Sequence, residues 1–594
     1  MVEKRADVLI EVSWEACNKV GGIFTVLSSK ALQMVNKYGE NYYAIGPYFA
    51  TQALGQFEET VAPQMFKALT EELKKEGIIL RFGKWLVKGE PNAILVDFHS
   101  FMQYGDGIKK FLWDHFGISS IRASYDYTEP IVWGWAVGKL IEKLKGCFGD
   151  KKVVAHFHEW LAGSALLYLK KQNVKVGKVF TTHATILGRT LASNDIDLYN
   201  QLKTVKPEQE AYKYSIEAKY GIEKMSAFNA DVFTTVSEIT GLEAEYLIGR
   251  KPDVLVLNGL DMEKFPTFEE CAIKHLQYRE KMKEFILYYF YPYYYFDLEN
   301  TLIFFLAGRY EFRDKGVDVY IKALGKLNDA LKKKKESMNV VAFVFIPGAI
   351  RGIKHELLEN REFYFDLRET VDDEMPEIRR HIIRNIVAQQ QLSKQTLFDQ
   401  EFLDETKRKV LSLRRKGMPA LSTHDLLDQN DIIVRTLNQF GVDNAEDDRV
   451  KIIFYPTYLT GHDGLLDLNY YETIQACHLG VFPSFYEPWG YTPLETAALG
   501  VSSVTTDLAG FGLYIAKELK TERTPGIFVL KRMNKSDDEI IESLANFMYD
   551  FVHFSKHERI ANKQIAKNLS KLADWGLLID NYINAHNIAA DRNG

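Results

Sequence analysis

Cysteine is scarce in this chain. Its 594 residues include four cysteines, at Cys17, Cys147, Cys271 and Cys477, and none of them stands in a C-x-x-C pair. Four scattered cysteines are too few for the disulfide framework that supports many small secreted domains. We therefore expect free thiols and a reducing compartment, the cytoplasm.

Long apolar runs and a leader segment are also lacking. The longest apolar stretch, residues 340–347, is far below the ~20 residues that a membrane-spanning helix needs. The first seven residues, Met-Val-Glu-Lys-Arg-Ala-Asp, lead directly into a strand-like run and leave no room for the apolar region of a signal peptide. We expect a protein that is not exported and has no membrane partner.

Neither sign of charge dominates. The chain has 74 Lys and Arg against 80 Asp and Glu, a formal net charge of -6, with both signs mixed along it. Proteins that bind nucleic acid usually have a basic patch, so we expect no nucleic-acid partner. No group of histidine, cysteine and acidic residues has metal-ligand spacing, so we expect no catalytic metal and no other cofactor.

Short apolar runs alternate with longer helical patterns through most of the chain. Residues 7–10, 153–156, 178–181 and 232–236 lack polar alternation, which is typical of strands buried on both faces. The alternation resumes at 302–306, 340–345, 452–454 and 479–482. The predicted fold class is α/β, and two sheets of parallel strands are the simplest interpretation.

Turn residues at 258–261 end the first series of strands, and the pattern then becomes helical and charged. We place the domain boundary there. The first domain is expected to span 1–260 and to be completed by 573–594, and the second to span 261–572. Between about 354 and 439 the strand signal disappears, which predicts a helical arm inserted in the second domain.

Two glycines near the start follow a strand and open a helical stretch. Lys19 precedes Gly21 and Gly22, and this arrangement would let a phosphate approach the backbone at a helix N-terminus. A plain tight turn explains the pair equally well. The spacing is not the G-x-G-x-x-G pattern of dinucleotide-binding proteins, which weakens a dehydrogenase interpretation.

Cations follow a strand of the second half. Arg309 and Lys315 stand just past the carboxyl end of the run 302–306, where open α/β sheets bind their ligands. Two fixed cations there could stabilise the charge of a departing diphosphate. The alternative is an ordinary surface pair bound to nearby acids.

The most specific pattern is Glu-Pro-Trp-Gly-Tyr-Thr-Pro-Leu-Glu at 487–495, again directly after an apolar strand. Glu487 would lie on a loop and Glu495 on the helix after it. The N-terminus of that helix, with backbone donors at Gly490 and Thr492, could hold a phosphate while one carboxylate meets sugar hydroxyls and the other the ribose.

At this point the sequence resembles a known family, the retaining glycosyltransferases of the GT-B type, and among them the glycogen synthases of fungi and animals. The resemblance implies two Rossmann-like domains that face each other across a cleft. The resemblance runs from about residue 8 to residue 575. Its specific motifs lie at 18–23, 156–163, 182–189, 249–253, 307–316 and 477–495.

The resemblance implies roles for individual residues. His158, His183 and Arg189 would face the glucose and phosphates from the first domain. The implied catalytic residues are His158, Arg189, Arg309, Lys315 and Glu487. Arg309 and Lys315 would hold the diphosphate from the second domain. The remaining implied donor contacts are Lys19, Gly21 and Gly22 near the donor, Tyr470 on the base, Glu487, Trp489 and Gly490 at the glucosyl unit, Thr492 at a phosphate and Glu495 at the ribose.

The implied reaction transfers glucose from UDP-glucose to the non-reducing end of an α-1,4-glucan, glycogen or maltodextrin, with retention of configuration. Alternatives are a sucrose- or trehalose-forming enzyme of the same architecture, a glucan synthase that uses ADP-glucose, and a catalytically silent glucan-binding scaffold. We interpret His156 as a core histidine. The aromatic run 288–296 is interpreted as packing or interface, with a glucan-binding surface as the less favoured interpretation.

Assembly and regulation are the last expectations from the resemblance. Family members assemble through the region of the arm, so we expect a homotetramer. Fungal and animal members bind glucose-6-phosphate with an arginine-rich helix, whereas here residues 556–568 contain one arginine, Arg559, with Lys563 and Lys567 nearby. A second effector segment, residues 268–271, has an acid where the family has a histidine, although His275 and His478 remain. We therefore expect little response to glucose-6-phosphate.

Overall fold

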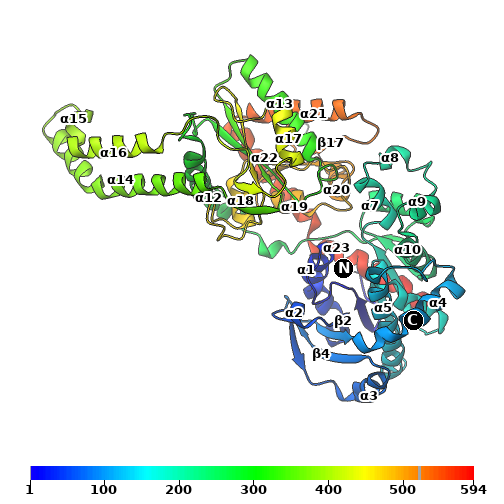
Figure 1. Cartoon of the computed structure of the whole chain (residues 1–594). Coiled ribbons are helices and arrows are strands. Elements are labelled where there is room, and N and C mark those ends of the chain that lie inside the picture. Colours follow the sequence, from blue (N-terminus) through cyan, green and yellow to red (C-terminus); the bar gives the residue numbers. More distant parts are fainter. Residues whose placement is uncertain (1, 520–522, 594) are drawn as a thin grey trace.

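The computed structural model describes residues 2–519 and 523–593, and in them the chain forms two large sheets, a two-stranded sheet of β12 (Ile350–Ile353) and β13 (His424–Leu426), and a projecting arm (Figure 1). The first sheet has nine described strands in the order β3-β4-β5-β2-β1-β6-β7-β8-β9. Pairing is parallel except at β3-β4 and β4-β5. The strands are β1 (Val8–Val12), β2 (Tyr42–Pro47), β3 (Phe57–Thr60), β4 (Ile79–Trp85), β5 (Asn92–Asp97), β6 (Val153–His158), β7 (Gly177–Thr182), β8 (Val232–Thr235) and β9 (Val254–Leu255).

The second sheet has six described strands in the order β14-β11-β10-β15-β16-β17, and all of its pairs are parallel. Its strands are β10 (Thr301–Ala307), β11 (Asn339–Phe345), β14 (Val450–Tyr455), β15 (Leu479–Val481), β16 (Ser502–Thr506) and β17 (Ile527–Leu530). Every residue of β10 and of β11 is buried, because hydrophobic clusters cover both faces of the sheet. One parallel and one mostly parallel sheet confirm the predicted α/β class.

The C-terminal helix returns to the first sheet. The chain leaves that sheet after β9, and Leu260 then pairs with Asp574 in an isolated bridge. Helix α23 (Trp575–Asn593) packs across β6 and β7 and buries Tyr582 and His586 there. The C-terminus therefore lies beside the N-terminus in space, as Figure 1 shows.

The arm is shorter than the sequence indicated. Helices α14 (His355–Val387) and α16 (Gln400–Leu413) contact each other and project away from both sheets (Figure 1). The expected insert extended to residue 439, but α17 (Ile432–Gln439) buries Ile433 and Leu437 in the core of the second domain. Helical periodicity in the sequence does not show which core a helix joins, and this is why the expected insert was too long.

The aromatic run 288–296 is mostly packing. Tyr288, Tyr289, Phe290 and Phe296 are buried in the hydrophobic cluster that includes one face of the second sheet, whereas Tyr295 is exposed. No helix within residues 2–519 and 523–593 is long and apolar enough to cross a membrane.

Candidate active site

Two loops at the carboxyl edge of the second sheet bring a cation and a carboxylate together. Lys315 follows β10 and Glu487 follows β15, and Lys315 Nζ donates to Glu487 Oε2 at 2.6 Å. Gly316 allows this approach, since its φ is +69° and a Cβ there would lie 2.0 Å from the carbonyl oxygen of Pro483. Lys315, Glu487 and Thr492 are among the residues that line a small pocket at this edge.

Arg309 lies at the open side of this edge. Its side chain is exposed, and its guanidinium forms an ion pair of 3.1 Å with Glu311 of the same loop. An exposed ion pair in water contributes little stability, so the guanidinium is free to turn toward an anionic ligand at small cost. Arg309 and Lys315 therefore share one loop, with one cation exposed and the other held beside a carboxylate.

The helix after Glu487 begins with an open N-terminus. Gly490 is the N-cap of α19 (Tyr491–Ala498), with φ of +109°, and no described side chain caps it. Thr492 stands in the first turn beside the pocket. Free backbone N–H groups at a helix N-terminus suit a phosphate, which is the role expected for Gly490 and Thr492.

Trp489 does not line this pocket. Its indole is buried against Phe511 and Tyr514, and its Nε1 has no hydrogen-bond partner among the described residues. The sequence-based expectation that Trp489 meets a glucosyl unit therefore does not hold for the side chain. The indole instead belongs to the hydrophobic cluster that the two domains share.

Glu495 points toward a pair of tyrosines. Tyr471 donates a hydrogen bond of 2.9 Å to Glu495 Oε1, and Tyr470 precedes it at the start of α18 (Tyr470–Ala476). Burial raises the pKa of Glu495 to about 7, although hydrogen bonds from Tyr471 and Tyr470 oppose the shift. Sequence reasoning selected Tyr470 for base stacking and overlooked Tyr471, the more exposed ring, because adjacent tyrosines look equivalent in a sequence.

In the first domain, the helix N-terminus after the glycine pair is already capped. The Glu15 carboxylate accepts 2.8 Å hydrogen bonds from the backbone N–H groups of Gly21 and Phe24 at the start of α1 (Gly22–Tyr38). A carboxylate there competes with any phosphate for the same donors. Glu15 therefore already occupies the Gly21 donor, whereas contact of Gly22 and of the exposed Lys19 with the donor substrate stays a prediction.

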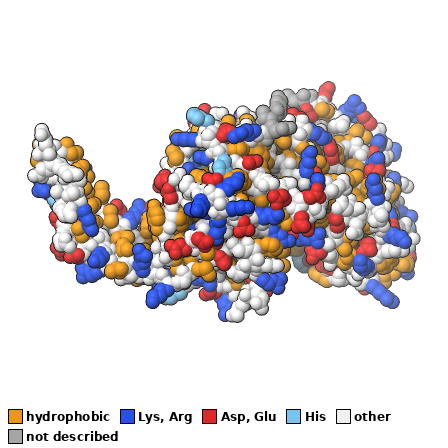
Figure 2. Space-filling view, turned by 90° about the horizontal axis from the view of Figure 1, so that it is seen from above, with side chains coloured by type: hydrophobic (Ala, Val, Ile, Leu, Met, Phe, Trp, Pro, Cys, Tyr) orange, Lys and Arg blue, Asp and Glu red, His pale blue; other side chains and the backbone are white. Residues whose placement is uncertain are grey.

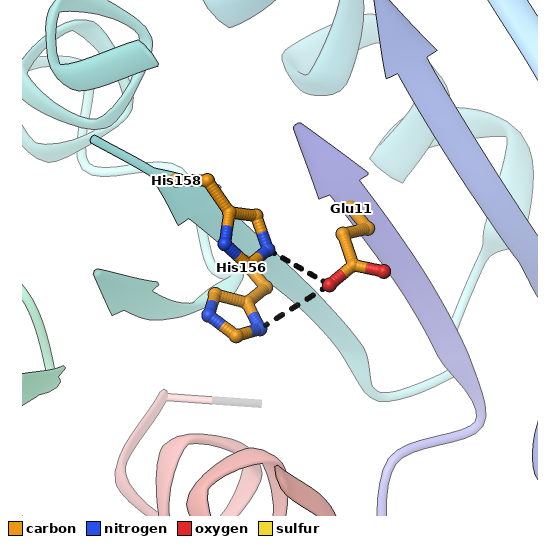
Figure 3. A group of neighbouring side chains, drawn as sticks. All are labelled: Glu11, His156 and His158. Carbon is orange, nitrogen blue, oxygen red and sulfur yellow. Dashed lines mark hydrogen bonds and ion pairs between the residues drawn. The ribbon is translucent and has the colours of Figure 1, made fainter. Parts of the chain in front are cut away.

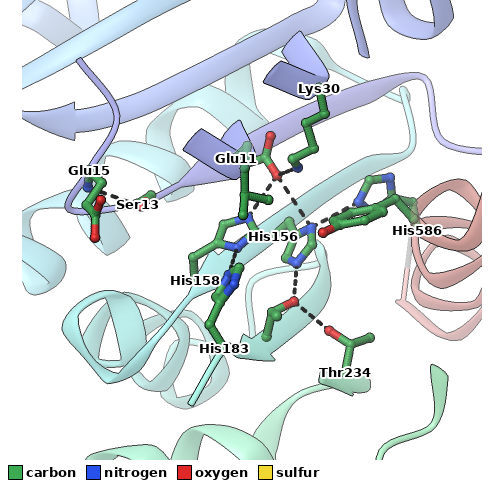
Figure 4. Close-up of polar contacts among 12 residues, drawn as sticks. Glu11, Ser13, Glu15, Lys30, His156, His158, His183, Thr234 and His586 are labelled. Carbon is green, nitrogen blue, oxygen red and sulfur yellow. Dashed lines mark hydrogen bonds and ion pairs between the residues drawn. The ribbon is translucent and has the colours of Figure 1, made fainter. Parts of the chain in front are cut away.

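His158 and His183 lie deeper than expected (Figure 4). His158 is buried, 1% exposed, with Nε2 at 2.8 Å from Glu11 Oε1 and Nδ1 at 2.9 Å from His183 Nε2. It therefore cannot face a donor as the family resemblance implied, because His183 and Glu11 already occupy both of its nitrogens. His183, at 7% exposure on the loop after β7, is the outermost of the three.

His156 is a core histidine, as interpreted from the sequence. It is fully buried, stacks on His158 and contacts His586 of α23 through Nδ1 at 3.1 Å.

Glu11, His156 and His158 lie close enough to be considered as metal ligands (Figure 3). However, the Lys30 ammonium is paired with the same Glu11 oxygen that faces both histidines. A metal ion there would be repelled by that buried ammonium, and His156 Nδ1 is already engaged by His586. The three residues do not fit a metal ion.

Arg189 faces the second domain from helix α7 (Ile186–Ser193), which Thr185 caps. At the end of this helix, Ser193 donates a hydrogen bond of 3.1 Å to Asp314, the neighbour of Lys315. The Arg189 side chain is exposed, and desolvation by the surrounding protein opposes its protonation. Tyr486 and the carboxylates of Glu159, Glu311 and Glu487 outweigh this effect and raise the pKa of Arg189. Arg189 thus lies within electrostatic reach of the Lys315–Glu487 pair.

A buried acid connects the same elements. Glu243 accepts hydrogen bonds from Thr185 at 2.7 Å, from Tyr199 at 2.9 Å and, across the domain boundary, from Tyr486 at 3.2 Å. Burial raises the pKa of Glu243 to about 7, although these hydroxyl groups oppose the shift. Sequence reasoning missed this residue because no motif surrounds it.

The geometry described above defines a class of protein. Two Rossmann-like domains meet at an edge where Arg189 from one domain is within electrostatic reach of Glu311, Tyr486 and Glu487 of the other, and this is the architecture of a GT-B glycosyltransferase. The catalytic domain of starch synthase IV from Arabidopsis thaliana, solved with ADP and acarbose, has the same fold, with a TM-score of 0.52, 13% identity and coverage of 99% of this chain and 100% of that one.

Sequence comparison gives the family. The glycogen synthase family model matches residues 11–593. Glycogen [starch] synthase of Dictyostelium discoideum is 38% identical over 588 residues, which cover 98% of this chain and 67% of that protein. The liver glycogen [starch] synthase of Rattus norvegicus is 36% identical over 587 residues, covering 98% and 83%. The chain belongs to the glycogen synthase family and is a glycosyltransferase.

Proposed function

We propose that this enzyme transfers glucose from UDP-glucose to the non-reducing end of an α-1,4-glucan and retains the α configuration. The observation that supports this most is the Lys315–Glu487 pair beside the open N-terminus of α19, with Arg189 facing it. Cations and free backbone N–H groups suit a diphosphate, and the carboxylate suits sugar hydroxyls. Family membership supports a glucan as acceptor, more than the sucrose- or trehalose-forming alternative.

The proposed chemistry is a substitution on one face of the sugar. The bond between the glucosyl C1 and the diphosphate oxygen breaks, and the acceptor hydroxyl oxygen forms its bond to C1 from the same side. The departing phosphate oxygen takes the proton of that hydroxyl. Lys315, Arg309 and Arg189 stabilise the negative charge that develops on the diphosphate. Closure of the two domains around the donor would exclude water and suppress hydrolysis of the donor.

The most detailed part of the proposal is the identity of the base in the donor nucleotide. Tyr470 and Tyr471, which flank Glu495, offer an aromatic surface for a base, and either uracil or adenine could stack on it. The names of the curated relatives do not specify the base, and we propose UDP on the sequence resemblance.

Turnover with each donor on a glycogen primer tests both the reaction and the base. We expect the glucose label to remain in polymer and to increase with added glycogen. We also expect faster turnover with UDP-glucose than with ADP-glucose. Labelled disaccharide would point to the alternative glycosyltransferases, and preference for ADP-glucose would change the donor. Absence of nucleoside diphosphate release with every donor and primer would indicate a silent scaffold.

For assembly and location, we propose a cytoplasmic homotetramer held by the α14–α16 arm. The arm has exposed apolar side chains that would otherwise face water, at Met375, Ile383, Ile386, Val387, Leu392 and Leu411. Figure 2 shows hydrophobic side chains gathered along the arm. All four cysteines are free thiols, which supports a reducing compartment.

A further inference from the structure

A hydrogen-bonded line of buried side chains leads from the centre of the first sheet to its active-site edge (Figure 4). Glu11 of β1, His158 at the end of β6 and His183 on the loop after β7 form it, with contacts of 2.8 Å and 2.9 Å. The Lys30 ammonium and the Tyr42 hydroxyl hold Glu11 at the inner end. His183 forms the outer end, where Glu159 binds its backbone N–H at 2.8 Å.

The Glu11 carboxylate at the inner end determines which ring nitrogen of each histidine carries a proton. An ionised carboxylate only accepts, so His158 must donate its Nε2–H to Glu11. A neutral His158 then has an unprotonated Nδ1, which can only accept, and His183 must donate its own Nε2–H to that atom. His183 is thereby left with an unprotonated Nδ1. No described residue forms a hydrogen bond with this Nδ1.

The charges around the line agree with this assignment. Burial alone would raise the pKa of Glu11, but Lys30 and the two histidines hold it well below its usual value, so Glu11 is ionised. Burial, with Lys30 nearby, lowers the pKa of His158 and of His183. Both rings are therefore neutral near neutral pH, which a fixed tautomer requires.

We propose that Glu11 and His158 are positioning residues that hold His183 as its Nε2–H tautomer, so that His183 Nδ1 accepts a hydrogen bond from a hydroxyl of the donor sugar. The inference rests on the proposed function, because the ligand is the glycosyl unit of the nucleotide-sugar. It gives a role to the buried His158 that needs no contact with substrate. Without a fixed tautomer, His183 would carry its proton on Nδ1 in part of the molecules. In those molecules Nδ1 could not accept a hydrogen bond from the sugar hydroxyl.

A second line in the same core offers a matched control. Thr234 donates to the carbonyl oxygen of Phe180 at 3.2 Å, so Thr181 donates to Thr234 and His156 donates its Nε2–H to Thr181 at 2.6 Å. His156 is as buried as His158 and stacks on it, with ring centroids 4.2 Å apart. Its line runs through His586 to Tyr38 and does not include His183.

The first experiment compares two substitutions at each histidine. In His158→Gln the amide can donate to Glu11 and accept from His183, whereas His158→Leu can do neither. We expect His158→Leu to lower kcat/KM for the nucleotide-sugar by about tenfold, the effect of roughly one hydrogen bond, with the KM for glucan unchanged. His158→Gln should recover most of that loss. His156→Leu should lower the melting temperature comparably but leave kcat/KM for the donor within about twofold of wild type.

Equal losses in His158→Leu and His156→Leu, or no recovery by His158→Gln, would overturn the proposal and leave a purely structural role. Wild-type activity separates this result from a failure of the proposed function, since an inactive wild type with every donor and primer would reject the function itself.

A second measurement is made on the wild-type protein and uses a variant only for assignment. In protein labelled with 15N-histidine, the ring nitrogen shifts of His183, assigned by their loss in His183→Gln, report its tautomer directly. An unprotonated Nδ1 with a protonated Nε2 is expected across neutral pH. A protonated Nδ1 would refute the inference even if the His158 variants failed to fold.

Discussion

Lys315 and Glu487 are 172 positions apart in the sequence, and their side chains meet at 2.6 Å. They meet because β10 and β15 are adjacent in the second sheet and both chains leave it at the same edge. A lysine and a glutamate in contact offer a cation for phosphate and an acceptor for sugar hydroxyls within one small pocket. This pair is the centre of the proposed active site.

The two cations of the loop after β10 should be essential for turnover. Lys315→Ala and Arg309→Ala should each lower kcat by about a thousandfold at near-normal thermal stability, because each removes charge stabilisation of the departing diphosphate. Lys333→Ala, at the exposed end of α13 (Val317–Lys333), is the matched control and should change kcat by less than about twofold. Steady-state kinetics and melting curves measure both effects, and a mild loss of activity at either Arg309 or Lys315 would remove it from the site.

Glu243 should make stability fall as pH rises. Its pKa is about 7 in the folded chain against an ordinary value of 4.5, so the folded state retains a proton that the unfolded state loses between those values. Glu243→Gln resembles the protonated acid. Its free energy of unfolding should rise relative to that of wild type by roughly 1–3 kcal/mol between about pH 4.5 and about pH 7, and the difference should stay constant above that pH.

Denaturation series across this pH range measure the difference. Glu269→Gln, at an exposed position of α12 (Phe268–Phe290), is the control and should run parallel to wild type. A Glu243→Gln curve that also runs parallel to wild type would show that the acid is already ionised in the folded protein.

Glucose-6-phosphate should have little effect on the rate. Two cations of helix α22 (Lys556–Ser570) are already engaged, since Lys567 donates to the carbonyl oxygen of Ala498 at 2.6 Å and Arg559 donates to that of Phe554. Burial and the guanidinium of Arg279 lower the pKa of Lys563 to about 7, so its positive charge is incomplete at neutral pH. Initial rates with and without millimolar effector decide the matter. Stimulation of about tenfold or more would mean that the lysines suffice to bind the phosphate.

The arm should determine the oligomeric state. Replacing Ile383, Ile386 and Val387 by serine removes exposed apolar surface from α14 without touching either sheet, and we expect the mass in solution to fall from that of a tetramer. Glu369→Ser on the same helix should leave the mass unchanged. Light scattering during gel filtration measures it, and a monomeric wild type at micromolar concentration would contradict the proposal.

Much of the fold could be predicted from local patterns. Uninterrupted apolar runs at 302–306 and 340–345 indicated strands buried on both faces, and they form β10 and β11. The loss of strand signal predicted the arm, but the predicted arm ended too far along the chain. Helix α17 has the same helical periodicity as the arm, yet it packs into the core of the second domain. Periodicity depends on near neighbours in the chain, whereas the choice of core depends on contacts far along it.

The amino-acid sequence by itself determined the α/β class, the order of the motifs and the presence of Arg189, Arg309, Lys315, Glu487 and Glu495 at strand or helix ends. Only the tertiary structure decided that Glu15 caps the helix expected to bind phosphate, that the Trp489 indole lies in the core, and that Glu11 and His158 stand behind His183. The physical reason is that burial and hydrogen-bond partners depend on residues brought together from distant segments. A motif specifies a side chain's chemistry, and the neighbours that the fold supplies specify its protonation, its direction and its access to substrate.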